Sequence, residues 1–221
     1  MRLKAVAVQA ALLLAAGAVG PLLHAQTAGS DDLVDGRDYQ SISPAQPTSV
    51  PGGKVEVTEV FMYSCPHCYA FEPMLQDWEK SKADYVEFVR LPASWNRVAK
   101  LHAQAYYTAQ VLGKLGEMDQ AFFHEFHVQH NFLDTTDKLR DFFGRYGVDA
   151  KTFDKTFDSP EVRAKMQHAD DLIERYGVTG TPSLVVNGKY LTMGSMAGSY
   201  ERWFAIVDEL AKREHDAAAP N

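Results

Sequence analysis

Short stretches of the chain in which β-branched and aromatic residues alternate with polar ones predict β-strands. The clearest stretch is 54–63, which is rich in valine from Val55 onward and reaches an aromatic residue at Phe61. Weaker stretches of the same kind occupy 37–42, 84–91, 183–186 and 189–193. The dipeptide Asn187-Gly188 separates the last two, and it is typical of a two-residue hairpin turn. The pattern therefore predicts a β-hairpin near the C-terminus.

Hydrophobic residues recur every three or four positions through most of the middle of the chain, and this period predicts helices. One helix is predicted from Pro66 to about Lys80, with a kink at Pro73 because proline removes a backbone hydrogen bond. Further helices are predicted at 100–111, 118–128, 134–146, 159–176 and 199–212. The order of strand, helix, strand, helical block, hairpin and helix predicts an α/β fold in which 94–177 form an inserted helical domain.

The first 25 residues have the order of a secretory signal, with positive charges at Arg2 and Lys4, an apolar run, and a small residue at Ala25. The functional chain is then expected to begin near Gln26. An uncleaved membrane anchor is the alternative, but the run is rich in alanine and is interrupted by glycine and proline. Residues 26–53 are interpreted as a lead-in, and 215–221 as a disordered tail.

The composition limits the classes of function. The chain has 221 residues, of which 46% are hydrophobic, so it can bury the core of one substantial domain. Its formal net charge is −7, and removal of the two cations of the leader makes it more acidic. An acidic surface does not favour phosphates, so no nucleic-acid partner is expected.

Two cysteines are present, separated by two residues in Cys65-Pro66-His67-Cys68. A disulfide between them closes too small a loop to stabilise the fold much, so the pair is predicted to be reactive. A structural zinc site normally needs four ligands, and no further cysteine is available. The histidines His124, His127 and His130 recur every three residues and are interpreted as ordinary polar helix positions. We therefore predict no metal, and no cofactor besides the redox-active cysteine pair.

The cysteine pair lies where the predicted strand ends and the next helix begins. Cys65 takes the N-cap position, and Pro66 the first helical position, where its missing N–H costs nothing. Unpaired backbone N–H groups and the positive end of the helix dipole favour a thiolate at Cys65, which predicts that Cys65 is the attacking group. Cys68, one turn later, is suited to resolve a mixed disulfide. His67 is predicted to stabilise the thiolate and so to make the disulfide a stronger oxidant; an exposed histidine without a role is the alternative.

The segment Phe61–Glu72, with the sequence FMYSCPHCYAFE, resembles the active-site segment of the DsbA family, periplasmic dithiol oxidases that introduce disulfides into exported proteins. The resemblance covers nearly the whole mature chain. It implies a thioredoxin-like domain formed by 26–93 and 178–221 and interrupted by the helical domain of 94–177. It also implies an oxidising disulfide, unfolded exported proteins with paired cysteines as substrates, and a DsbB-like membrane protein that reoxidises the pair. A monomer in the periplasm is expected.

Two features outside the motif acquire a role through the same resemblance. Gly180-Thr181-Pro182 resembles the family's cis-proline loop, which lies beside the cysteines and pairs, through the backbone at Thr181, with a substrate's extended chain. A simple turn before a strand is the alternative. Glu59 lies six residues before Cys65 on the central predicted strand and shares a face with Val55, Val57 and Phe61. We therefore expect a partly buried carboxyl with a raised pKa that accepts or relays the proton of Cys68. A solvated strand residue is the alternative for Glu59.

Two other functions stay open at this point. The first is a disulfide isomerase or reductase, which keeps its cysteines reduced; the known periplasmic isomerases also carry a dimerisation domain, for which 26–53 is too short. The second is a noncatalytic module that holds unfolded chains on an apolar surface around Tyr63, Tyr69 and Pro182. Removal of the Cys65 sulfur distinguishes them, because only the enzymes depend on it.

Overall fold

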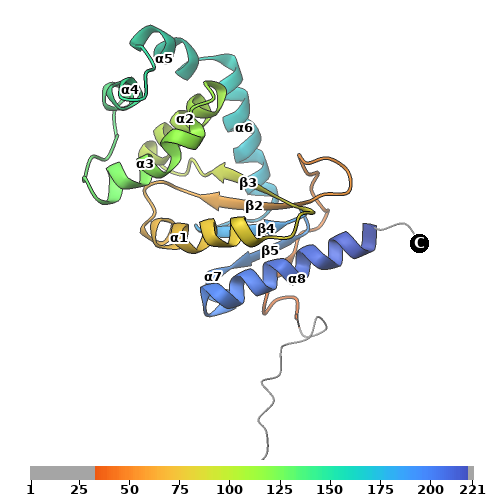
Figure 1. The fold of residues 1–221 in the computed structure, drawn as a ribbon. Coiled ribbons are helices and arrows are strands. Elements are labelled where there is room, and N and C mark those ends of the chain that lie inside the picture. Colours follow the sequence, from red (N-terminus) through yellow and green to blue (C-terminus); the bar gives the residue numbers. More distant parts are fainter. Residues whose placement is uncertain (1–32, 219–221) are drawn as a thin grey trace, which may run out of the picture. The chain divides into compact units, whose positions relative to one another are not determined.

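The computed structural model describes residues 33–218, which belong to one compact unit. The expected secretory signal at 1–25 lies outside the described residues, as do 219–221. Figure 1 shows a central sheet with helices on both of its sides. Within the described part of the chain, no helix has the length and apolar character needed to cross a bilayer.

Five strands form one mixed sheet in the order β1-β5-β4-β2-β3. They are β1 (Gln40–Ser41), β2 (Val55–Phe61), β3 (Val86–Pro92), β4 (Ser183–Val186) and β5 (Tyr190–Met193). β2 and β3 are parallel, whereas the other neighbouring strands are antiparallel. All seven residues of β2 are buried, as expected for a strand that is covered on both faces. The carboxyl end of β2, where the cysteine motif follows, is therefore firmly placed.

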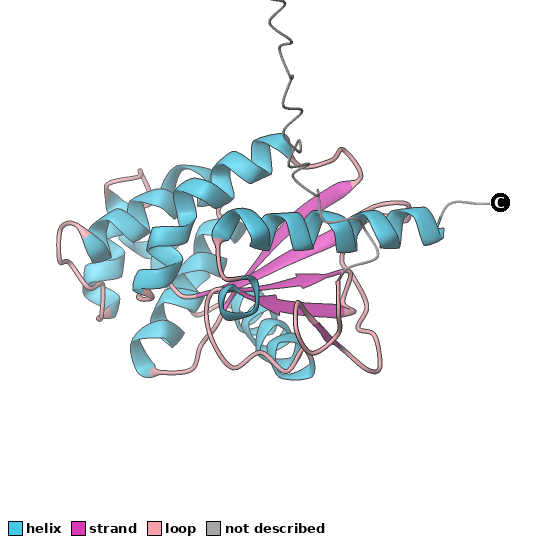
Figure 2. Cartoon of the chain, turned by 90° about the horizontal axis from the view of Figure 1, so that it is seen from below, coloured by secondary structure: helices cyan, strands magenta, loops and turns pink. Residues whose placement is uncertain are grey.

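Helices α1 (Pro66–Ser81) and α8 (Tyr200–Ala218) pack on one face of the sheet. Alternate strand residues such as Val57 and Leu184 face them, and the ring of Phe71 on α1 stacks on Trp203 of α8 at 4.8 Å between centroids. Figure 2 shows the helix that leads to the C-terminus lying over the strands. A single turn, α7 (Gly194–Ala197), precedes α8. This packing holds the start of α1 against the sheet.

The insert between β3 and β4 consists of five helices that pack around an aromatic core, distinct from the cluster beneath α1 and α8. They are α2 (Arg97–Val111), α3 (Leu115–His127), α4 (Thr136–Gly144), α5 (Ala150–Phe157) and α6 (Pro160–Arg175). The core includes Phe122, Phe142 and Phe153, and it is continuous with Val60 of β2 and Val185 of β4. Since Val60 and Val185 point away from α1, the insert covers the second face of the sheet.

The strands, the hairpin and most helices are confirmed to within a few residues, but two short helices were missed. α5 has eight residues, of which Phe153 and Phe157 are buried, and α7 has four. Such lengths are too short for a hydrophobic period to be recognised. The Asp149 side chain, which accepts from the backbone N of Thr152 at 3.0 Å, is the cap that marks the start of α5 in the sequence.

The predicted disordered tail is wrong for residues 215–218, because α8 continues to Ala218. Glu214 is buried and accepts hydrogen bonds from Asn187 and Lys189 of the hairpin. The ring of His215 stacks on Tyr85 at 4.0 Å between centroids. These contacts with distant segments extend the helix beyond the point that its own sequence indicates.

His102 on α2 is expected to make the stability of the insert sensitive to acid. Its Nε2 lies 3.0 Å from the backbone oxygen of Phe132, and its buried Nδ1 has no hydrogen-bond partner among the described residues. Burial lowers the pKa of His102 to about 4. In the unfolded chain this ring takes up a proton near pH 6.5, whereas in the folded chain it stays neutral down to about pH 4. Protonation therefore favours the unfolded chain between these values, and the free energy of unfolding falls by roughly 3 kcal/mol as the pH drops from about 6.5 towards 4.

Urea unfolding at a series of pH values measures this effect in His102→Gln. Glu59 contributes with the opposite sign over the same range, since its folded-state pKa is raised to about 7, and the comparison is therefore made between variants. We expect His102→Gln to lose less stability than the wild type on acidification. The exposed His168 provides the matched control, His168→Gln, and equal pH profiles for all three proteins would contradict the prediction.

Candidate active site

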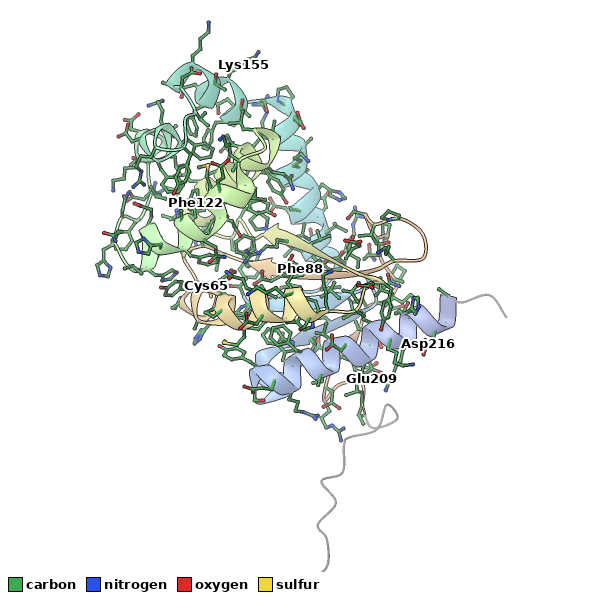
Figure 3. The ribbon with its side chains drawn as sticks, viewed as in Figure 1. Cys65, Phe88, Phe122, Lys155, Glu209 and Asp216 are labelled. Atoms are coloured by element: carbon green, nitrogen blue, oxygen red, sulfur yellow. The ribbon has the colours of Figure 1, made fainter. Side chains whose placement is uncertain are left out.

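Cys65 caps helix α1, as predicted. Its backbone is extended, its Sγ lies 3.3 Å from the backbone N of Cys68, and Pro66 follows at the start of the helix. Figure 3 labels Cys65 at this end of α1. Cys65 retains 7% exposure whereas Cys68 has 0%, so a sulfur from outside can reach only Cys65.

The two thiols have pKa values shifted in opposite directions. A hydrogen bond from the Cys68 thiol, with further contacts from Thr181 and from backbone N–H groups, lowers the pKa of Cys65 to about 5 despite its burial. Burial, the hydrogen bond to Cys65 and the charge of Glu59 raise the pKa of Cys68 far above its usual range. At neutral pH Cys65 is therefore a thiolate and Cys68 is protonated, which is the division that thiol–disulfide exchange requires.

The structure places the Gly180-Thr181-Pro182 loop beside Cys65. The peptide bond between Thr181 and Pro182 is cis, and Cys65 Sγ lies 3.4 Å from the backbone oxygen of Thr181. The Ser183 hydroxyl donates to the oxygen of Gly180 at 2.7 Å and so fixes the loop at the start of β4. A backbone carbonyl thus lies next to the sulfur that a substrate must approach.

A groove of about 670 Å³ opens beside the cysteine motif. Its lining includes His67, Thr181, Pro182, Met193 and Tyr200. The His67 side chain is exposed and belongs to this groove, whereas Pro66 is exposed at the start of α1. An extended peptide can therefore lie beside Cys65 with one edge on the loop.

Glu59 on β2 is fully buried, and the alternative of a solvated strand residue is wrong. Its Oε2 lies 2.8 Å from Nε of Arg90, while its buried Oε1 has no hydrogen-bond partner among the described residues. Burial raises the pKa of Glu59 to about 7; Arg90 opposes this shift, and the charges of Glu72 and Asp119 add to it. The carboxyl can therefore exchange a proton at neutral pH.

Arg90 on β3 joins Glu59 to two more carboxylates, in a network that was not predicted from the sequence. Its guanidinium lies 2.5 Å from Asp119 of α3 and also pairs with Glu72 of α1. The guanidinium carbon lies 4.2 Å from the centroid of Phe61. The sequence offered one signal, a single arginine in the strand stretch 84–91. The parallel pairing that sets Arg90 directly opposite Glu59 is seen only in the structure.

Tyr63, two residues before Cys65, is held by α3 at two points. Its hydroxyl donates to Asp119, and its backbone oxygen lies 2.8 Å from Nε2 of His127. The imidazole of His127 also stacks on Tyr69, with 4.6 Å between centroids and 10° between the rings. Its interpretation as an ordinary polar helix position is therefore wrong.

The other two histidines of that series differ from His127. His124 is exposed on α3, and His130 lies beyond the end of the helix. Among residues 33–218, no group of three or more histidine, cysteine or acidic side chains is arranged to hold a metal ion. The structure therefore brings together Cys65, Cys68, Thr181 and Pro182, with His67 at the groove and Glu59 beneath.

Comparison with protein families gives a match to the DSBA-like thioredoxin domain over residues 87–210. This match begins after the cysteine motif, so the motif is a separate observation. The thiol:disulfide interchange protein DsbA of Pseudomonas aeruginosa is 39% identical over 208 residues, which cover 94% of this chain and 98% of that protein. The DsbA of Burkholderia cepacia is 34% identical over 93% of this chain and 95% of that protein.

Solved structures show the same similarity in three dimensions. The crystal structure of Pseudomonas aeruginosa DsbA has a TM-score of 0.79 and 38% identity, and covers 85% of this chain and 97% of its own. The oxidoreductase DsbA from Xylella fastidiosa has a TM-score of 0.77 and 35% identity, and covers 83% of this chain and 98% of its own. The similarity therefore includes both the sheet and the helical insert.

Proposed function

Because this chain belongs to the DsbA family of thiol:disulfide interchange proteins, we propose that its Cys65–Cys68 disulfide is donated to exported proteins with paired cysteines in the periplasm. The chain is a thiol:disulfide oxidoreductase with a thioredoxin-like fold. One observation supports transfer of the disulfide from this protein to the substrate rather than the reverse. Cys65 is stabilised as a thiolate by the Cys68 thiol and by the first backbone N–H groups of α1, so the reduced pair is favoured and the disulfide is readily given away.

The proposed reaction begins when a substrate thiolate attacks Cys65 Sγ of the oxidised pair. The new S–S bond joins the substrate to Cys65, the Cys65–Cys68 bond breaks, and the Cys68 sulfur leaves with the electron pair. Because its pKa is strongly raised, Cys68 takes up a proton. We assign the supply of this proton to Glu59, which is buried, lacks a partner at Oε1 among the described residues and has a pKa of about 7.

A second substrate thiolate then attacks the substrate sulfur of the mixed disulfide. The substrate disulfide forms, and Cys65 leaves as a thiolate, which is its stable form at neutral pH. The substrate has lost two electrons and the cysteine pair has gained them. Pairing of the substrate backbone with Thr181, beside Pro182, is proposed to hold the reacting sulfur in line without reading the sequence. His67 is proposed to stabilise the Cys65 thiolate further.

The reduced cysteine pair must pass its two electrons to an acceptor before the next turnover. We propose that a DsbB-like membrane protein accepts them and that no cofactor besides the cysteine pair is needed in this chain. The basic and apolar leader at 1–25 supports export to the periplasm, an oxidising compartment in which disulfides persist.

The redox equilibrium of the wild-type protein with glutathione tests the proposed direction. We expect a reduction potential above that of the glutathione couple, read from the fraction of alkylated protein across a series of glutathione buffers. The ultraviolet absorbance of the thiolate is expected to titrate with a midpoint near pH 5. A potential below that of glutathione would instead assign the chain to the reductases.

A further inference from the structure

Helix α3 of the insert contacts the turn that leads into the cysteine motif. This turn is closed by a hydrogen bond of 3.0 Å from the backbone N of Cys65 to the oxygen of Met62. Within it, the oxygen of Tyr63 accepts a hydrogen bond of 2.8 Å from His127, and the Tyr63 hydroxyl donates to Asp119. Asp119 and His127 lie eight residues apart, on one side of α3. The insert therefore holds both the backbone and the side chain of Tyr63.

The backbone contact identifies the ring nitrogen that donates. A carbonyl oxygen can only accept, so Nε2 of His127 carries the hydrogen that it donates to Tyr63. The ring is partly buried, and Tyr69, Phe123 and Phe126 surround it. Stacking on Tyr69 joins His127 to the first turn of α1 as well, so one side chain contacts the chain on both sides of the cysteine motif.

We propose that His127 is a positioning residue that makes the cysteine pair more oxidising, by holding the turn at Tyr63 so that Cys65 stays at the N-cap of α1. This proposal rests on the oxidase function proposed above and adds a determinant of its strength. The determinant lies in the inserted domain, outside the thioredoxin-like part of the chain.

The contact is expected to act on one redox state more than on the other. In the disulfide form a covalent bond holds Cys65 beside Cys68. In the dithiol form only noncovalent contacts hold the Cys65 sulfur at 3.3 Å from the backbone N of Cys68. Loss of the His127 hydrogen bond therefore weakens thiolate stabilisation in the reduced protein, while the oxidised protein is restrained by its own disulfide.

Two substitutions separate the hydrogen bond of His127 from its stacking. His127→Phe keeps an aromatic ring on Tyr69 but removes the donor, whereas His127→Gln keeps a donor and removes the ring. The control is His124→Phe, one turn earlier on α3 and exposed. Each variant is equilibrated with glutathione, and the Cys65 pKa is read from thiolate absorbance.

We expect His127→Phe to be roughly fivefold less oxidising in its equilibrium constant with glutathione, the factor that corresponds to one hydrogen bond. Its Cys65 pKa should rise, and its reduced form should lose more thermal stability than its oxidised form. His127→Gln and His124→Phe should keep the wild-type equilibrium. An unchanged equilibrium in His127→Phe overturns the proposal, and equal losses in the Phe and Gln variants overturn the assignment to the hydrogen bond.

A measurement on the reduced wild-type protein keeps the proposal testable if His127→Phe does not fold. A long-range ¹H–¹⁵N spectrum of the imidazoles should show His127 with a hydrogen on Nε2, and an Nε2 without a hydrogen overturns the proposal. The failure of the proposed function is a different result. It appears as a wild-type potential below that of glutathione, whereas the role of His127 is read from the ratio of the variant's equilibrium constant to that of the wild type.

Discussion

Cys65→Ser is expected to abolish disulfide transfer to reduced peptides that contain two cysteines. The serine oxygen can neither form the disulfide with Cys68 nor carry a substrate as a mixed disulfide. Cys68 cannot take the place of Cys65, because its sulfur is fully buried and its raised pKa keeps it protonated. Peptide oxidation should fall to the rate of buffer without enzyme. Mass spectrometry of the peptide, after its free thiols have been alkylated, measures this rate.

Cys68→Ser is the matched control, because it removes a sulfur from the same motif and leaves Cys65 in place. Here the Cys65 thiolate can still attack a disulfide that joins two one-cysteine peptides, and neither Cys68 nor a second substrate cysteine is present to release the captured peptide. Mixed disulfides with substrate should therefore accumulate, and nonreducing gels detect them. Peptide oxidation by Cys65→Ser at the wild-type rate would rule out the enzyme. Holding of unfolded chains by this variant would identify a separate peptide-binding activity.

The cysteine site was largely predictable because its geometry is local. A strand that ends at Phe61, a cysteine at the N-cap and Pro66 at the first helical position together specify the direction of the Cys65 sulfur. The burial of Glu59 was also expected, because alternate residues of a strand share a face. Periods of two and of 3.6 residues depend on the sequence alone, and so the strands and longer helices could be predicted from it.

The parts that could not be predicted depend on contacts between distant segments. Asp119 and His127 lie more than fifty residues after the turn that they hold, and nothing in the spacing of a helix shows which loop its face will meet. The role of Arg90 depends on the register of β2 and β3, which the sequence does not specify. The end of α8 likewise depends on Glu214, whose partners are in the hairpin.

Arg90→Met is expected to cause the largest loss of stability, roughly 3–5 kcal/mol, because it leaves buried carboxylates without their counter-charge. The guanidinium pairs with Glu59, Glu72 and Asp119, and only 11% of the Arg90 side chain is exposed. The three carboxylates come from β2, α1 and α3, so the sheet, the active-site helix and the insert all lose a common partner. Urea unfolding at neutral pH gives the free energy of unfolding.

Arg140→Met provides the matched comparison, because Arg140 also pairs with two carboxylates, those of Asp137 and Asp154, but does so at the surface of the insert. Exposed ion pairs contribute at most about 1 kcal/mol, so this variant should unfold close to the wild type. Glu72→Gln in the Arg90→Met background removes one of the unpaired charges and should restore part of the stability. Equal losses for Arg90→Met and Arg140→Met would show that the buried network does not hold the three elements together.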